Sequence, residues 1–180
     1  QRRLAGNTGL DRAPAWSPDG QYLAWESHVS IMPDIWKCRA DGSDARPVIP
    51  RDRPIAIKAT AQRDVVDVQP LVRGNDFYLT DPIWSPDGTR IAGVGLSGSR
   101  MVYVLAADGS SVLQVIPSLP YVNHLCWSPD GDYLAGAWAC GPQETERSGI
   151  FVVHAENGDR RFLVDVTPSG PRLGGARRRL

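Results

Sequence analysis

The pentapeptide WSPDG occurs three times in this chain of 180 residues, at positions 16–20, 84–88 and 127–131. Catalysis needs one copy of its chemical groups, so a threefold recurrence indicates a repeated structural unit or a repeated ligand-binding turn. Trp84 and Trp127 are 43 residues apart, whereas Trp16 and Trp84 are 68 apart. A period in the 40s is typical of propellers and solenoids, and the longer first interval indicates an insertion of about 25 residues.

Each unit predicts four short strands joined by turns. The first strand ends at the Trp of WSPDG, where Pro suits the second position of a type I turn, Asp the third, and Gly the left-handed closing residue. A second turn, Asp-Gly or Asn-Gly between apolar runs, is a strong hairpin signal. The second, third and fourth strands are expected at 22–26, 35–39 and 47–49, then at 90–94, 102–106 and 112–116, and finally at 133–137, 150–154 and 161–164.

Several of these strands are apolar on both faces, which requires a sheet that is covered on both sides. Blades stacked around an axis meet this requirement, and no stretch shows sustained helical periodicity. The predicted fold is therefore all-β, with four-stranded antiparallel β-propeller blades in three repeats that form a partial propeller. The expected organisation is an outer strand of a preceding blade at 1–10, blade 1 at 11–49, an insertion with an extra hairpin over the disc at 50–80, blade 2 at 81–116, blade 3 at 121–165 and a flexible basic tail at 166–180.

Three blades do not close a ring, because propellers usually have about four to eight. An open arc would leave two apolar faces in water, and large apolar patches mark interfaces or aggregation hazards. We expect the chain to be a fragment of a longer propeller protein. The alternative is a homodimer that closes a six-bladed ring, with residues 1–5 of each chain completing a blade of the partner.

The WSPDG turns are expected to be structural, because an Asp in such a turn satisfies its own backbone N–H groups. The turn residues are Asp19, Gly20, Asp87, Gly88, Asp130 and Gly131. Both kinds of turn share one end of the blade, so a binding site is expected at the other end, where loops differ between blades. The candidate residues at this channel mouth, for a peptide tail or a small ligand, are Asp11, Arg12, Asp81, Arg100, Asn123 and His124. The alternative is a solvated channel rim without a ligand.

Composition and motifs argue against several function classes. Twenty cationic and twenty anionic residues give zero net charge, so nothing draws the chain to nucleic acid, and no apolar run approaches the length of a membrane span. Cys38, Cys126 and Cys140 lack zinc-ligand spacing; we expect buried thiols, with a Cys126–Cys140 bridge as the alternative. No hydrolase elbow, P-loop or metalloprotease motif occurs. We therefore expect no catalytic residues, no metal and no cofactor, and we expect His154 to be a packed core residue.

The repeat as a whole resembles a known family. WSPDG, two apolar strands and a turn of the Ala-Asp-Gly-Ser type are similar to the TolB-type, WD-like propeller repeat of bacteria, over residues 11–165. The third unit departs from it at Glu156-Asn157-Gly158. The resemblance implies a non-catalytic scaffold for protein or peptide partners in a periplasmic or extracellular setting, with the cytoplasm left open. Similar repeats occur in the propeller of prolyl-oligopeptidase-like serine peptidases, and a sensor ectodomain of a receptor or kinase is a further alternative.

Overall fold

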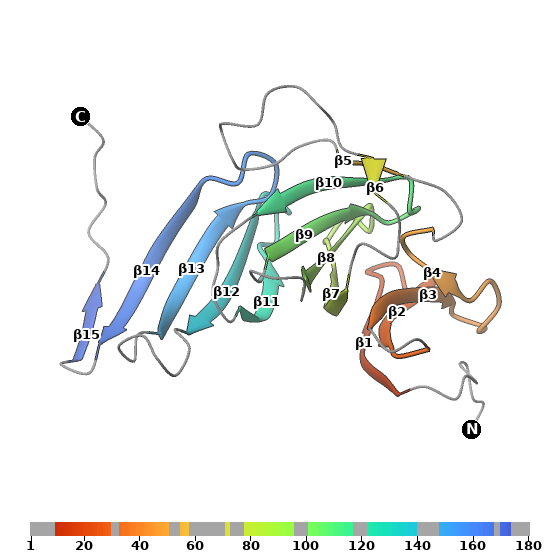
Figure 1. Cartoon of the computed structure of the whole chain (residues 1–180), viewed down its shortest axis with the longest axis horizontal. Helices are drawn as coiled ribbons and strands as arrows, with labels where there is room; N and C mark the ends of the chain where they lie inside the picture. Colours follow the sequence, from red (N-terminus) through yellow and green to blue (C-terminus); the bar gives the residue numbers. More distant parts are fainter. Residues whose placement is uncertain are drawn as a thin grey trace.

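The structure is a computed structural model in which three β-sheets follow one another along the chain (Figure 1). It describes residues 10–29, 33–50, 55–57, 71–72, 78–95, 101–116, 122–139, 148–167 and 170–173. All elements among these residues are strands. The chain is therefore all-β, with antiparallel sheets arranged as blades of a partial propeller, as the sequence predicts.

Blade 1 is a four-stranded antiparallel sheet. Its strands are β1 (Asp11–Trp16), β2 (Tyr22–Ser27), β3 (Asp34–Arg39) and β4 (Arg46–Pro47). Blades 2 and 3 repeat this antiparallel order. Their strands are β7 (Leu79–Trp84), β8 (Arg90–Gly95), β9 (Met101–Ala106) and β10 (Ser111–Ile116), then β11 (Asn123–Trp127), β12 (Tyr133–Ala139), β13 (Ser148–His154) and β14 (Arg160–Thr167).

Two sheets gain strands at their outer edges. Within the expected insertion, β5 (Ile55–Ile57) and β6 (Leu71–Val72) pair antiparallel, as the predicted extra hairpin requires. Because β5 also pairs in parallel with β10, the two strands extend the outer edge of blade 2 and do not lie over the disc. Within the expected flexible tail, β15 (Gly170–Leu173) pairs with β14. An outer strand presents unpaired backbone groups, and pairing with a further strand satisfies them. The expected preceding strand at residues 1–5 lies outside the described residues.

The WSPDG turns are held by the same hydrogen bonds in each blade. In blade 1 the Gly20 N–H donates to the Ser17 carbonyl at 2.9 Å, and Gly20 has a φ of 67°. The Ser17 hydroxyl donates to Asp19 Oδ1 at 2.6 Å, and the Gln21 N–H donates to the same oxygen at 2.9 Å. The corresponding Ser–Asp bonds are 2.5 Å long in blades 2 and 3. The carboxylate thus binds two donors of its own turn.

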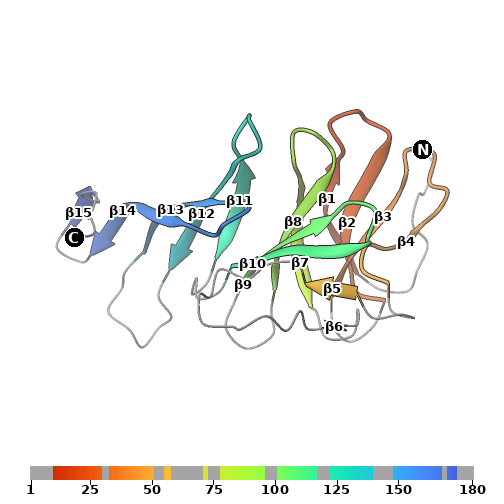
Figure 2. The ribbon, with the colours of Figure 1, turned by 90° about the horizontal axis from the view of Figure 1, so that it is seen from above.

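A further backbone bond ties the two turns of each blade together. The Ala40 N–H donates to the Gln21 carbonyl at 2.8 Å, and the N–H groups of Ala107 and Ala155 make the equivalent bonds in the other blades. Figure 2 shows the three WSPDG turns on the same side of the molecule. One end of the arc therefore consists of tightly closed structural turns.

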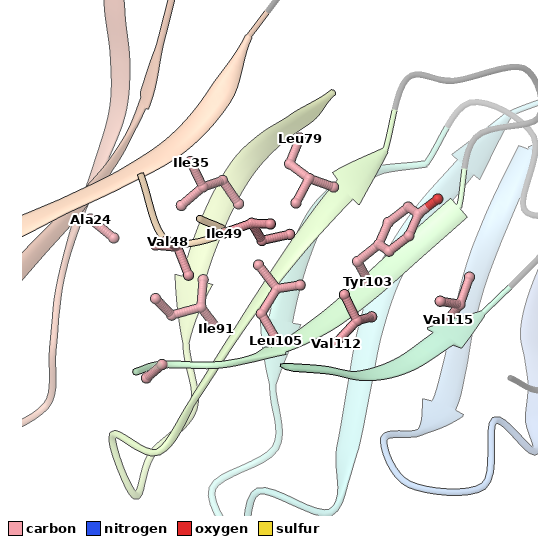
Figure 3. Packing of buried hydrophobic residues seen from close by; sticks show 11 residues of the cluster. Ala24, Ile35, Val48, Ile49, Leu79, Ile91, Tyr103, Leu105, Val112 and Val115 are labelled. Atoms are coloured by element: carbon pink, nitrogen blue, oxygen red, sulfur yellow. The ribbon is translucent and has the colours of Figure 1, made fainter. Parts of the chain in front are cut away.

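Most of the core lies between blades. One buried cluster joins Ala24, Ile35, Val48 and Ile49 of the blade 1 segment to residues of blade 2 such as Leu105 (Figure 3). A second cluster lies between blades 2 and 3 and contains residues such as Val102 and Phe151. Repeat proteins that contact only their neighbours gain their stability from such interfaces.

Glycine permits the close approach of blades 1 and 2. A Cβ atom added at Gly93 would lie 2.7 Å from Ile35 Cδ1 and 3.1 Å from the Thr80 carbonyl oxygen. Because these distances are shorter than ordinary packing contacts, a side chain at this position would force the two sheets apart.

The repeat tryptophans of blades 2 and 3 each bond to the blade before them. Trp84 Nε1 donates to the Ala15 carbonyl at 3.1 Å, and Trp127 Nε1 donates to the Ile83 carbonyl at 3.4 Å. Both acceptors belong to the residue that precedes the tryptophan of the earlier blade. The described part of the chain places no blade before blade 1, and Trp16 is 56% exposed.

The half-buried Trp84 should stabilise the interface between blades 1 and 2. We expect Trp84→Ala to lower the free energy of unfolding by about 3 kcal/mol, at the low end for a large aromatic side chain. Trp84→Phe keeps much of the packing but leaves the Ala15 carbonyl without its donor, and should cost about 1 kcal/mol. Urea unfolding followed by circular dichroism measures both. A loss well below 1 kcal/mol for Trp84→Ala would show that the ring does not hold the interface.

The turn carboxylates should make the fold sensitive to acid. The Ser hydroxyls and backbone N–H groups lower the pKa of Asp19 and Asp130 below the usual 3.8; at Asp87 burial opposes this, but the hydrogen bonds with Ser85 and Thr89 still lower its pKa. At a pH close to these pKa values, the unfolded chain therefore binds more protons than the folded chain. The free energy of unfolding then falls as the pH decreases through this range. Thermal unfolding between about pH 5 and pH 3 should show a shallower decline in a variant with Asn at all three positions. An unchanged slope would contradict this role.

Candidate functional site

The innermost strands form one continuous surface. Strands β1, β7 and β11 are edge strands of their sheets, and β7 contacts both β1 and β11. They run from the channel mouth towards the WSPDG turns. Side chains that leave these strands on the exposed side can therefore act together on one ligand.

A β-bulge interrupts each inner strand at the same repeat position. The pairing register shifts between Arg12 and Ala15, between Thr80 and Ile83, and between Asn123 and Cys126. At each bulge the residue three before the tryptophan has a left-handed backbone. These residues are Ala13, Asp81 and His124, with φ values of 46°, 52° and 53°.

The bulges present Asp81 and His124 to solvent on contacting strands. Both side chains are exposed. A left-handed conformation costs a non-glycine residue about 1–2 kcal/mol, although Asp and His tolerate it better than most. Bulges commonly re-aim side chains next to binding or active sites. The sequence signal for the bulges is weak: a proline follows Ala13 and Asp81, which disfavours the α-helical region, but Leu125 follows His124.

The start of β1 carries a hydrogen-bonded group. Asp11 Oδ1 accepts the Ser27 hydroxyl at 2.7 Å and the Trp25 indole N–H at 3.2 Å. Next to it, Glu26 Oε1 lies 2.6 Å from His28 Nε2. Neither Trp25 nor Glu26 was among the residues selected from the sequence, because their cross-strand partners are set by the β1–β2 register.

The structure brings only some of the predicted channel-mouth residues together. Asp81 and His124 occupy equivalent positions, and Asp11 and the exposed Arg12 lie at the start of the neighbouring strand. Asn123 precedes the third bulge. Arg100 lies outside the described residues.

The other end offers a hollow of about 390 Å³ between blades 1 and 2. Tyr22, Trp84 and the buried Lys37 line it, together with Asp19 and Asp108. The Lys37 ammonium donates to the Ala107 carbonyl, and burial lowers the pKa of Lys37. Because this cation already bonds across the interface, the hollow belongs to the packing of the two blades.

Cys38 is buried as expected, whereas Cys126 and His154 are more exposed than the sequence predicts. Cys38 is buried, and burial raises the pKa of its thiol, but Cys126 is a free and exposed thiol. Cys140 lies outside the described residues. His154 is half-buried, and its ring packs against the Tyr133 ring in a T-shaped arrangement with the ring centroids 5.1 Å apart. Within the described ranges, no group of three or more His, Cys, Asp or Glu residues could hold a metal ion, and no helix could cross a membrane.

Comparison with known proteins agrees with this architecture. A 47-residue segment is 40% identical to part of the Tol-Pal system protein TolB of Syntrophus aciditrophicus. This match covers 26% of this chain and 10% of that protein. The crystal structure of TolB from Acinetobacter baumannii matches 89% of this chain with a TM-score of 0.60 and 15% identity. The chain is a partial β-propeller of TolB-like repeats.

These TolB-like repeats also match propellers of enzymes. An acylaminoacyl peptidase of Pyrococcus horikoshii matches 92% of the chain with a TM-score of 0.58 and 10% identity, which covers 25% of that protein. No family model matches the chain. The chain spans about a third of the solved Acinetobacter TolB, for which the match covers 33%. At these identities the solved structures establish the fold and leave the activity open.

The left-handed bulge of the TolB-like repeat predicts a specific response to substitution. Asp81→Gly should leave the protein more stable than Asp81→Val by roughly 1–2 kcal/mol, because glycine adopts a φ of 52° without strain. The matched control is the same pair of substitutions at exposed Asp132, which does not have a positive φ. There the Gly variant should not be more stable than the Val variant. Chemical denaturation measures all four variants. A Val variant as stable as the Gly variant at Asp81 would contradict the bulge geometry.

Proposed function

We propose that the chain is a non-catalytic propeller scaffold that binds a protein or peptide segment along its inner strands. The repeated bulge is the observation that supports this most directly. It places an exposed carboxylate at Asp81 and an exposed imidazole at His124, on contacting strands and in a strained conformation. Exposed strain contributes nothing to packing, and strained positions occur preferentially at ligand-binding sites.

The chemistry of this surface suits a peptide. Asp11, Asp81, Arg12 and His124 combine hydrogen-bond acceptors and donors of both charge signs. A peptide segment offers amide N–H groups, carbonyls and at most a few charges, which such a mixed surface can satisfy. Nucleic acid requires a basic surface, and the chain has zero net charge.

The location follows from the resemblance. One relative is named as a component of the Tol-Pal system. We place the scaffold in the cell envelope of a bacterium, in a periplasmic or extracellular setting, where it would meet protein partners.

A second candidate function is the propeller of a prolyl-oligopeptidase-like serine peptidase. The match to the acylaminoacyl peptidase supports it. In that case the propeller would control access to a catalytic domain with its own Ser, Asp and His on the same polypeptide. A sensor ectodomain, the other alternative, would stand beside a transmembrane segment. The presence of either neighbour in the gene distinguishes these functions from the scaffold.

Selection of linear peptides by phage display tests the scaffold. Selected peptides should lose about tenfold or more in affinity for Asp81→Gly and for His124→Gly, because the side chains are removed without adding backbone strain. Asp132→Ala, at the WSPDG end, removes an exposed carboxylate and should leave the affinity unchanged. Fluorescence anisotropy with labelled peptides gives the dissociation constants. Peptides that bind all three variants equally well would show that the inner strands are only a solvated rim.

A further inference from the structure

Blade 1 differs from the other two blades at the channel mouth. Glu26 of β2 lies opposite Arg12 of β1 and is only 6% exposed. In the register of the other blades, the position of Glu26 is taken by Val94 and Ala137. The same position in the repeat therefore carries a buried carboxylate in blade 1 and an apolar side chain in blades 2 and 3.

The neighbouring positions show the same contrast. Asp11 and Asp34 are the cross-strand partners of Ser27, on either side of β2. Blade 2 has Leu79 and Met101 at these two positions. Replacing buried charged pairs by apolar residues is often neutral or stabilising, so apolar side chains are sufficient for packing here. The polar residues of blade 1 therefore indicate a role other than packing.

The carboxylates at the start of β1 and the end of β2 already accept hydrogen bonds from the chain itself. Asp11 Oδ1 accepts the Ser27 hydroxyl and the Trp25 indole N–H. Glu26 Oε1 lies 2.6 Å from Nε2 of His28, which can donate a proton to this bond. These acceptors are therefore occupied before any ligand binds.

Donors remain available at Arg12 and His28. The Arg12 side chain is exposed, and within the described ranges its guanidinium makes no hydrogen bond or ion pair. The side chain of His28 is 27% exposed. Because its Nε2 is directed at Glu26, its Nδ1 is the ring nitrogen that remains for a ligand. The free groups at this end of blade 1 thus suit a ligand that accepts hydrogen bonds and carries negative charge.

The register places both donors on one face of blade 1. His28 follows Glu26 by two residues, so its side chain leaves the sheet on the face that carries Glu26 and Arg12. The His28 N–H donates to the Leu10 carbonyl at 2.9 Å, which extends the strand pairing to this residue. Diagonal neighbours in an antiparallel pair have Cα atoms about 7–8 Å apart, within reach of long side chains. The two side chains can therefore meet at one ligand group.

We propose that Arg12 and His28 bind a carboxylate group of the peptide, and that Glu26 is a positioning residue that fixes the His28 ring. The inference rests on the proposed peptide-binding function and names the chemical group that is bound. A guanidinium binds a carboxylate through two parallel hydrogen bonds, and a protonated His28 between two carboxylates donates one N–H to each. Asp81 and His124, on the neighbouring inner strands, would contact other parts of the same peptide.

Pools of random short peptides attached to beads by their N-termini test the proposal. The first pool has free C-terminal carboxylates and no Asp or Glu, and the second has amidated C-termini but contains Asp and Glu. The third is amidated and contains neither, so it has no carboxylate. We expect the full chain to bind the first or the second pool about tenfold more tightly than the third, and the preferred pool identifies a terminal or a side-chain carboxylate.

Substitutions connect this preference to the two donors. Arg12→Gln and His28→Gln should each remove most of it, because each takes away a charged donor but keeps a polar side chain. Arg39→Gln is the matched control: Arg39 is also exposed but lies at the WSPDG end of β3, so its loss should leave the preference unchanged. Far-UV circular dichroism establishes that the variants keep the fold of the parent chain.

The remaining outcomes separate this inference from the peptide scaffold itself. Equal binding of the parent chain to all three pools, or a preference that Arg12→Gln leaves unchanged, would overturn the carboxylate site. If Asp81→Gly still weakened binding in that case, the scaffold function would stand without it. A chain that binds none of the pools would overturn both.

Discussion

The indole N–H bond across each interface is the interaction on which the arrangement of the blades depends. It joins the end of one inner strand to the carbonyl just before the tryptophan of the previous blade, as in Trp84 and Ala15. A single residue thus ends a strand, begins the WSPDG turn and fixes the distance to the neighbouring sheet. Because the acceptor is a backbone carbonyl, the same bond can form in every blade whatever side chain the acceptor residue carries.

The inner strands combine a rigid part with a variable part. At the tryptophan, backbone and ring geometry repeat closely. Three residues earlier the backbone geometry still repeats, but the side chain changes from Ala13 to Asp81 to His124. A constant bulge with a variable side chain is a simple way to hold different chemical groups at equivalent places around one axis. It keeps the residues proposed to bind a ligand separate from the residues that pack the blades.

The sequence was sufficient to predict those parts of the fold that depend on residues close together in the chain. WSPDG and the Asp-Gly or Asn-Gly turns predicted the strands and blades because each turn is fixed by the residues within it. The bulges were not predicted, because they arise from pairing between strands. The one local signal, a proline after the left-handed residue, is present at only two of the three bulges. The parallel pairing of β5 with β10 was missed for a similar reason: it joins segments far apart in the chain. Of the candidate site, the residue types were predictable, but the equivalence of Asp81 and His124 required the register.

The side chains that cover the tryptophans differ between the two interfaces. Tyr22 covers Trp84 through an aromatic contact, whereas Arg90 covers Trp127 through a cation–π contact. The two interfaces therefore differ in hydrophobicity and charge although their backbones are alike, so exchanging neighbours would place each covering group against a surface suited to the other. Similar repeats could pair in the wrong order while the chain folds. The difference between the two interfaces favours the pairing of each blade with its correct neighbour.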